Sequence, residues 1–168
     1  MADLFDPYKA LEALDRQRVT YIVIGALGRV IQGSDELTGG IDIVPSIREE
    51  NLRRLGLALD DLNARRTGGK PLALDRDLGR EPVLELETDA GELKIVPEPA
   101  GTRGYDDLRR RAVREPLGHG LRPAVASADD HARMLAALDR EQDREPLLTI
   151  RRLIELEHER HRGLSIER

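Results

Sequence analysis

The residues most able to do chemistry are one carboxylate and one ammonium, each set in an apolar run. Asp42 interrupts the apolar segment 41–44, and Lys94 interrupts the apolar segment 93–96. A carboxylate on an apolar strand is costly to bury alone, so Asp42 is either a ligand of a cation or half of an ion pair. Lys94 is either an internal cation beside Asp42 or the ion-pair partner of a glutamate, with Glu85 across the hairpin and Glu92 on its own strand as candidates.

Glycines precede the Asp42 segment in a pattern that suits close approach of a ligand to the backbone. Gly25 and Ala26 follow the apolar run 20–24, where a strand-to-helix turn could present backbone N–H groups to a phosphate. The same two residues could equally serve tight packing of a helix on a strand. Gly39 and Gly40 are either a simple turn with no role beyond backbone conformation or part of the same site. A phosphate site and a purely structural role therefore both stay open.

Short helices and strands must position these residues. Asp6 and Pro7 predict the start of a helix that runs to about residue 17. Ser46 and Glu49 form a capping-box pattern, which predicts a second long helix ending near residue 64. Between these two helices, periodicity and turn residues predict a strand over 20–24, a short helix over 26–32 and a strand over 41–44.

The second half of the chain contributes a hairpin and more helices. Residues 65–82 are rich in glycine and proline and predict a long connection with at most a short strand at 72–74. Residues 83–87 and 92–96 alternate with period two around a turn, which predicts a β-hairpin. The remaining predicted elements are a helix over 105–111, a strand over 122–126, a helix from Ser127 to about 138, and a helix from Pro146 to about 161.

This order of elements predicts an α+β fold with a small mixed β-sheet flanked by helices. The length of 168 residues is typical of a single domain. We expect one domain over 1–168, with the sheet core in about 1–100 and a mainly helical part in about 101–168.

Composition excludes several classes of protein. The chain has no cysteine, which excludes a disulfide scaffold, a thiolate metal site and a cysteine nucleophile. A net charge of −5 and an aromatic content of 2% argue against broad nucleic-acid binding. No apolar run approaches the length of a membrane helix, and the acidic start of the chain is unlike a signal peptide. We therefore expect a cytoplasmic protein with no membrane partner.

The motif around Asp42 resembles the nucleotidyltransferase fold of polymerase-β-type enzymes. Within that superfamily it is similar to a small bacterial branch of minimal nucleotidyltransferases and AbiE-type abortive-infection toxins. The first group of matching positions is Gly25, Ala26, Gly33, Thr38, Gly40 and Asp42. The similarity extends over about residues 10–155, and its later positions include Thr88, Gly91, Leu93, Gly101, Gly104, Tyr105, Asp107, Leu108, Val125, Ala126, Ser127, Asp130 and Asp143.

The resemblance implies a nucleotide site and, in active members, three carboxylates that hold two divalent cations. It implies that the nucleotide phosphates lie near Gly25, Ala26, Gly33, Ser34 and Thr38. The first carboxylate position is Gly40 here and the third is Lys94, so Asp42 is the only catalytic remnant. A single carboxylate cannot build a two-metal site.

Two functions follow as expectations. The favoured one is a degenerate protein that binds a nucleotide or a macromolecular partner, with no metal and no certain cofactor. The alternative is an active transferase that moves a nucleoside monophosphate from an NTP to a hydroxyl with Mg²⁺, using Asp35, Glu36 or Glu92 beside Asp42. A protein partner or a homo-oligomer is compatible with either function.

Overall fold

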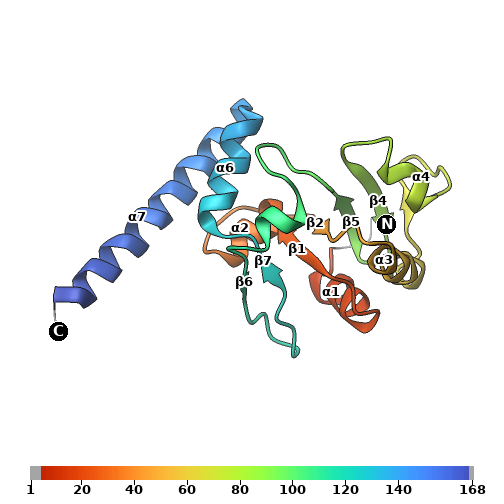
Figure 1. Ribbon diagram of the computed structural model, residues 1–168, viewed down its shortest axis with the longest axis horizontal. Helices are drawn as coiled ribbons and strands as arrows, with labels where there is room; N and C mark the ends of the chain where they lie inside the picture. The colour runs from red at the N-terminus through yellow and green to blue at the C-terminus, as the bar shows by residue number, and fades with distance from the viewer. Residues whose placement is uncertain (1–4, 167–168) are drawn as a thin grey trace.

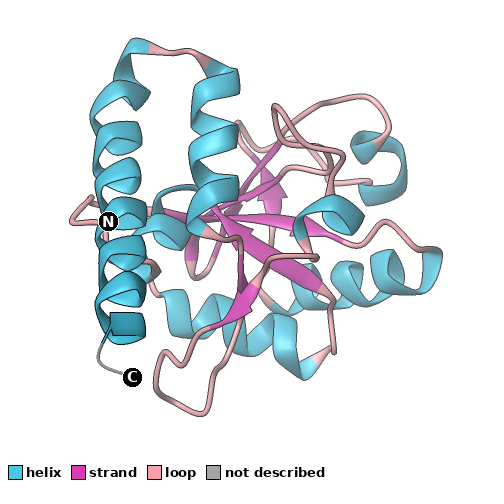
Figure 2. Cartoon of the chain, turned by 60° about the vertical axis from the view of Figure 1, so that its left-hand side comes forward, coloured by secondary structure: helices cyan, strands magenta, loops and turns pink. Residues whose placement is uncertain are grey.

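Strands with alternating apolar residues and amphipathic helices build a mixed sheet with helices on both faces (Figures 1 and 2). The computed structural model describes residues 5–166. The expected α+β fold with a mixed sheet is confirmed. The strands are β1 (Tyr21–Ile24), β2 (Gly40–Pro45), β3 (Arg65–Arg66), β4 (Leu84–Thr88), β5 (Gly91–Ile95), β6 (Val113–Arg114) and β7 (Ala124–Val125).

Within residues 5–166, seven strands form the sheet in the order β3-β4-β5-β2-β1-β7-β6. The pairs β2/β5 and β1/β7 are parallel, and the other neighbours are antiparallel. The predicted hairpin is β4 and β5, and its second strand lies directly beside β2. The strand that carries Asp42 is therefore central in the sheet.

Helices cover the two faces of the sheet unequally. The helices are α1 (Pro7–Arg16), α2 (Gly25–Ile31), α3 (Glu49–Asp61), α4 (Leu74–Leu78), α5 (Tyr105–Leu108), α6 (Ala128–Leu138) and α7 (Arg144–Ile166), with a 3₁₀ turn η1 (Glu141–Asp143) before the last. Ile41 and Ile43 of β2 point into the main core, which α1 and α3 close with leucines and alanines. No helix among residues 5–166 is both long and apolar enough to cross a membrane.

The opposite face of the sheet is only partly covered. Ile24 of β1 and Val44 of β2 pack there with Leu108 of α5 and Met134 of α6 in a smaller apolar cluster. The hairpin strands on this face carry exposed glutamates instead of apolar residues, at positions 85, 87 and 92. Asp42 lies between the apolar cluster and these glutamates.

The predicted capping box at Ser46 is wrong. The helix α3 begins at Glu49 with Arg48 as its N-cap residue, and no side chain of the described residues caps it. Ser46 is buried, and its carbonyl oxygen accepts a hydrogen bond of 2.7 Å from the Asn51 side chain. The Asn51 amide also bonds both backbone groups of Thr20 at 2.7 and 2.9 Å. Asn51 thereby ties the start of α3 to the segments that precede β1 and follow β2.

The connection 65–82 differs from its prediction. The short strand allowed at 72–74 is absent from the described structure, and the segment contains β3 and the short helix α4. Asp77 is buried, accepts a hydrogen bond of 2.9 Å from the Ala73 backbone and lies 3.5 Å from Arg66. This ion pair ties α4 to β3, and such a long-range contact leaves no local pattern in the sequence.

Elements of the C-terminal part also depart from the predicted bounds. The helix predicted over 105–111 ends at Leu108, the strand predicted over 122–126 is reduced to β7, and the strand β6 was not predicted. The last helix, α7, begins two residues before Pro146 and runs antiparallel to α6 (Figure 2). Its second half extends beyond the body of the protein (Figure 1).

Candidate functional site

Asp42 is a half-buried carboxylate on the partly open face of the sheet. In register it stands between Ile24 of β1 and Lys94 of β5. Within residues 5–166, no hydrogen bond or ion pair reaches its carboxylate. Burial raises the pKa of Asp42 above its ordinary value, and the positive charge of Lys94 only partly opposes this shift. Asp42 is therefore a carboxylate with incomplete charge compensation.

Lys94 pairs with Glu92 and not with either residue beside it in register. Its Nζ atom lies 3.5 Å from Glu92 Oε1, and the two side chains are 36% and 51% exposed. Glu85 and Asp42 occupy the neighbouring register positions on β4 and β2. Of the alternatives left open for Lys94, the pair with Glu92 is formed and the pair with Glu85 is not. Among the charged groups around Asp42, the Lys94 ammonium nonetheless lowers the pKa of Asp42 the most. It therefore lies within electrostatic reach of that carboxylate.

Gly25 allows the chain to pass directly against the Asp42 carboxylate. A Cβ atom at this position would lie 2.5 Å from Asp42 Oδ2, and the φ angle of Gly25 is +69°. Both the space and the backbone conformation therefore require glycine. Ala26 follows in the first turn of α2, and this contact brings the start of α2 to the candidate site.

Gly40 is glycine because β5 approaches too closely for a side chain. A Cβ atom at Gly40 would lie 2.6 Å from the backbone carbonyl oxygen of Glu92. By contrast, a Cβ atom at Gly39 would meet nothing within 4 Å. The position where the resemblance places the first metal-binding carboxylate therefore has no room for one unless β5 moves.

The loop between α2 and β2 is held by its own polar side chains. Arg29 forms two hydrogen bonds with Glu36, at 2.7 and 2.8 Å, and Ser34 Oγ donates a third to Glu36 at 2.8 Å. Burial alone would raise the pKa of Glu36, but these hydrogen bonds outweigh it and hold the pKa below its ordinary value. Thr38 Oγ1 donates to the Gly40 carbonyl oxygen at 2.8 Å. The Ser34 and Thr38 hydroxyls thus order the loop.

Gly33 lies beside α7 and not beside Asp42. A Cβ atom there would lie 3.7 Å from Leu153 of α7, and the φ angle of +115° favours glycine. Of the two glycines predicted to bind phosphate, Gly25 lies against Asp42 and Gly33 does not. Gly33, Ser34 and Thr38 form the loop that leads into β2.

Sequence reasoning missed two arginines that act on Asp42. Arg29 and Arg140 are both close enough to lower the pKa of Asp42. Arg140 lies at the end of the α6–η1 turn and bonds Asp143 at 2.6 and 3.1 Å. Each cation near Asp42 therefore has a carboxylate of its own. The sequence shows that each of the two arginines is close along the chain to its carboxylate partner. The approach of the arginines to Asp42, however, depends on the fold.

A buried histidine, also missed, supports α2. His131 of α6 is 1% exposed and lies where a Cβ atom at Gly28 would be only 2.8 Å from its Nε2 atom. In the described part of the chain, neither ring nitrogen has a hydrogen-bond partner. Burial and the charge of Arg29 lower the pKa of His131 to about 4, so the ring is neutral at pH 7. Gly28 and His131 together let α6 pack closely on α2.

The residues present do not fit a metal centre. Within the described residues, no three His, Cys, Asp or Glu side chains are grouped so that they could hold a metal ion. Glu92 is paired with Lys94, and Glu36 is paired with Arg29. Of the acids considered as replacements, Glu36 and Glu92 are therefore engaged elsewhere, while Asp35 lies exposed in the loop before β2.

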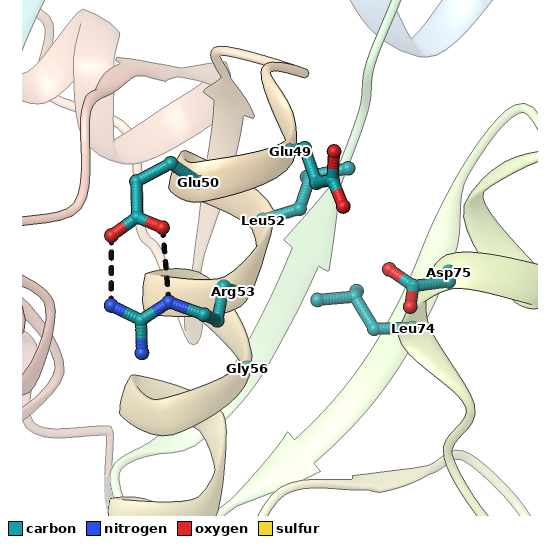
Figure 3. Close-up of a pocket in the computed structure, with 7 residues that line it drawn as sticks. All are labelled: Glu49, Glu50, Leu52, Arg53, Gly56, Leu74 and Asp75. Carbon is teal, nitrogen blue, oxygen red and sulfur yellow. Dashed lines mark hydrogen bonds and ion pairs between the residues drawn. The ribbon is translucent and has the colours of Figure 1, made fainter.

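A pocket of about 620 Å³ lies away from Asp42, between α3 and α4 (Figure 3). It is lined by Glu49, Glu50, Leu52, Arg53, Gly56, Leu74 and Asp75. Glu50 is bonded to Arg53 at 2.8 and 3.0 Å. Because α3 covers the closed face of the sheet, this pocket is separated from the Asp42 face by the main core.

Comparisons with known proteins support the fold. No protein-family model matches the chain, and no curated protein sequence matches it either. A solved structure from Thermotoga maritima, described as that of a candidate nucleotidyltransferase, is similar with a TM-score of 0.50. The match has 18% sequence identity and covers 95% of this chain and 90% of the other. The chain therefore has a nucleotidyltransferase-like fold, with Asp42 on the open face of its central sheet.

Proposed function

We propose that this protein is a degenerate nucleotidyltransferase-like protein that binds a nucleotide on the Asp42 face without metal-dependent transfer. The observation that carries the proposal is the register between β2 and β5, which pairs the Asp42 position with the Lys94 position. An ammonium thus occupies the strand position where the resemblance implies a third carboxylate. A cation from the chain itself can meet the nucleotide phosphates there.

Lys94 is suited to exchange its present partner for a phosphate. Its ion pair with Glu92 is about half exposed, and exposed pairs of this kind stabilise by only about 0.2–1 kcal/mol. A hydrogen bond from an ammonium to a phosphate is charge-assisted and stronger than a neutral one. Arg29 and Arg140 add positive potential near Asp42, as their effect on its pKa indicates.

The same site argues against transfer by two metal ions. That mechanism needs several carboxylates around the cations, because each divalent ion requires multiple oxygen ligands. Gly40 has no space for a carboxylate, and Lys94 adds positive charge where a cation would sit. The AbiE-type branch, and with it a role in a toxin–antitoxin pair, is part of this proposal and is supported by the order of the sequence motifs alone.

Calorimetric titration with ATP, GTP, CTP and UTP in EDTA tests the proposal. We expect at least one nucleotide to bind, and Lys94→Ala to weaken its binding by about tenfold, the effect of losing one charge-assisted contact of ~1.4 kcal/mol. Lys70→Ala is the matched control, because Lys70 is exposed in the connection 65–82, and it should leave the affinity unchanged. No binding of any nucleotide, or equal losses in the two variants, would contradict the proposal.

A further inference from the structure

The last helix continues well past the part of the protein that supports it. Ile150 in the first half of α7 is buried, and Leu153 and Ile154 are half-buried. From residue 155 to residue 165, every side chain is exposed, and this half projects away from the sheet (Figure 1). A helical segment this short is marginal in water without packing. The projecting half therefore lacks the tertiary contacts that normally stabilise a helix.

One stripe along α7 has the spacing of a coiled-coil seam. Thr149, Leu153, Leu156, Arg160 and Gly163 follow each other at alternating spacings of four and three residues. This spacing aligns side chains on one side of a helix for packing against another helix. Leu156, at the centre of the stripe, is 44% exposed. We call these five residues the α7 stripe.

Charged residues beside the α7 stripe are arranged so that two copies of the helix can pair opposite charges. Arg152 and Glu159 flank the same side of the α7 stripe, four residues before and three residues after Leu156. In an antiparallel pair of identical helices, residues on the same flank face each other across the seam. With the two-fold axis at Leu156, Arg152 of each copy lies opposite Glu159 of the other.

These charges are available for such contacts. Among the described residues, Arg152 pairs only with Glu155 of its own helix, at 3.1 Å, and such exposed pairs contribute little. Glu159 has no ion pair within residues 5–166. A parallel arrangement would instead place the two Arg160 residues against each other in the seam, which like-charge repulsion disfavours. Charge complementarity thus selects the antiparallel arrangement.

We propose that the α7 stripe pairs with the α7 stripe of a second copy of this chain, in an antiparallel two-fold dimer centred on Leu156. Leu156 then packs on its own counterpart, and Arg152 and Glu159 form two symmetric ion pairs. The contact is isologous, so it closes at two copies. Because Leu153 lies beside Gly33, the second copy's helix runs next to the loop that leads into β2.

Sedimentation velocity of the full chain over a concentration series tests the dimer. We expect a reversible monomer–dimer equilibrium that Leu156→Asp weakens by at least about tenfold, since a buried leucine contact is worth more than 1.4 kcal/mol. Leu148→Asp is the matched control, because Leu148 is also exposed on α7, at 66%, but lies off the stripe. A monomer at all concentrations, or equal loss with both variants, would overturn the proposal.

A charge exchange tests the antiparallel register without relying on a folding-sensitive leucine. Arg152→Glu and Glu159→Arg should each weaken the dimer, and the double variant should restore it, because the two ion pairs form again with reversed signs. Circular dichroism should show the same helix content for every variant at monomer concentrations. Restoration by Arg152→Glu with Glu157→Arg instead would indicate a parallel dimer and would contradict the proposal, as would the absence of any restoration.

Discussion

The face of the sheet under α1 and α3 and the face that carries Asp42 are made by alternate residues of the same strands. On β2, Ile41 and Ile43 enter the closed core while Asp42 points to the open face. On β5, Leu93 and Ile95 likewise enter the closed core, while Lys94 between them points to the open face. The closed face supplies the burial that holds the strands in register, and this register fixes the spacing of the charges on the open face. Substitutions on the two faces should therefore have different consequences.

The largest expected effect comes from the closed face. Ile43 is 0% exposed, and Ile43→Ala should lower the free energy of unfolding by about 2–5 kcal/mol, the usual cost of lost burial plus a cavity. Urea denaturation of the variant and the parent protein measures this difference. A loss below about 1 kcal/mol would mean that the closed face does not carry the stability assigned to it.

The second-largest effect is expected at Gly40, where β2 lies very close to the backbone of β5. Gly40→Asp should destabilise the protein by about 1–3 kcal/mol, because the new Cβ atom would collide with the Glu92 carbonyl oxygen. Gly39→Asp is the matched control, since a Cβ atom there meets nothing within 4 Å, and it should cost less than about 1 kcal/mol. Equal costs at the two positions would show that the close approach of β5 is not the constraint.

A smaller effect should appear in the pH dependence of stability. The pKa of Asp42 is raised in the folded state by burial. The contribution of this group is therefore fully present below the unfolded pKa and is lost as pH rises through the folded pKa. Asp42→Asn should remove that loss, so the variant gains stability relative to the parent as pH rises from 3 to 7. Urea denaturation across this range measures the gain, and a variant that instead loses stability relative to the parent would contradict the incomplete compensation of Asp42.

The smallest effect is expected for Lys94. Because its partner is the half-exposed Glu92 and not a buried carboxylate, Lys94→Ala and Glu92→Ala should each cost under about 1 kcal/mol. A double-mutant cycle on this pair should give a coupling of about 0.2–1 kcal/mol. A larger coupling between Lys94 and Asp42 than between Lys94 and Glu92 would show that Lys94 turns toward Asp42 in solution.

Local patterns predicted the closed face well because burial there follows strand periodicity. The alternation around Ile41 and Ile43, and the turn between β4 and β5, were sufficient to predict the strand and the hairpin with its register. The helix bounds were less accurate at α3, whose first turn is anchored through Asn51 to the backbone of the distant Thr20. Such contacts are set by the fold and are invisible in the sequence near the helix.

The open face was predicted only in part for the same reason. Asp42 and Lys94 stand out because each is a charge in an apolar run, but nothing in the local sequence brings Arg29 or Arg140 near them. The reason for glycine at position 40 is likewise the backbone of a strand some fifty residues later. The sequence could indicate which residues carry charge on this face, whereas identifying their ion-pair partners required the structure.

The dependence of nucleotide binding on magnesium tests the central claim most directly. The affinity of the protein for a nucleotide should be measured with Mg²⁺ and with EDTA, and transfer of labelled nucleoside monophosphate should be followed in the same samples. We expect similar affinities in the two conditions and no magnesium-dependent transfer, because Lys94 supplies the positive charge beside Asp42. Binding only with Mg²⁺, together with transfer that Asp42→Ala abolishes, would contradict the account and establish an active transferase.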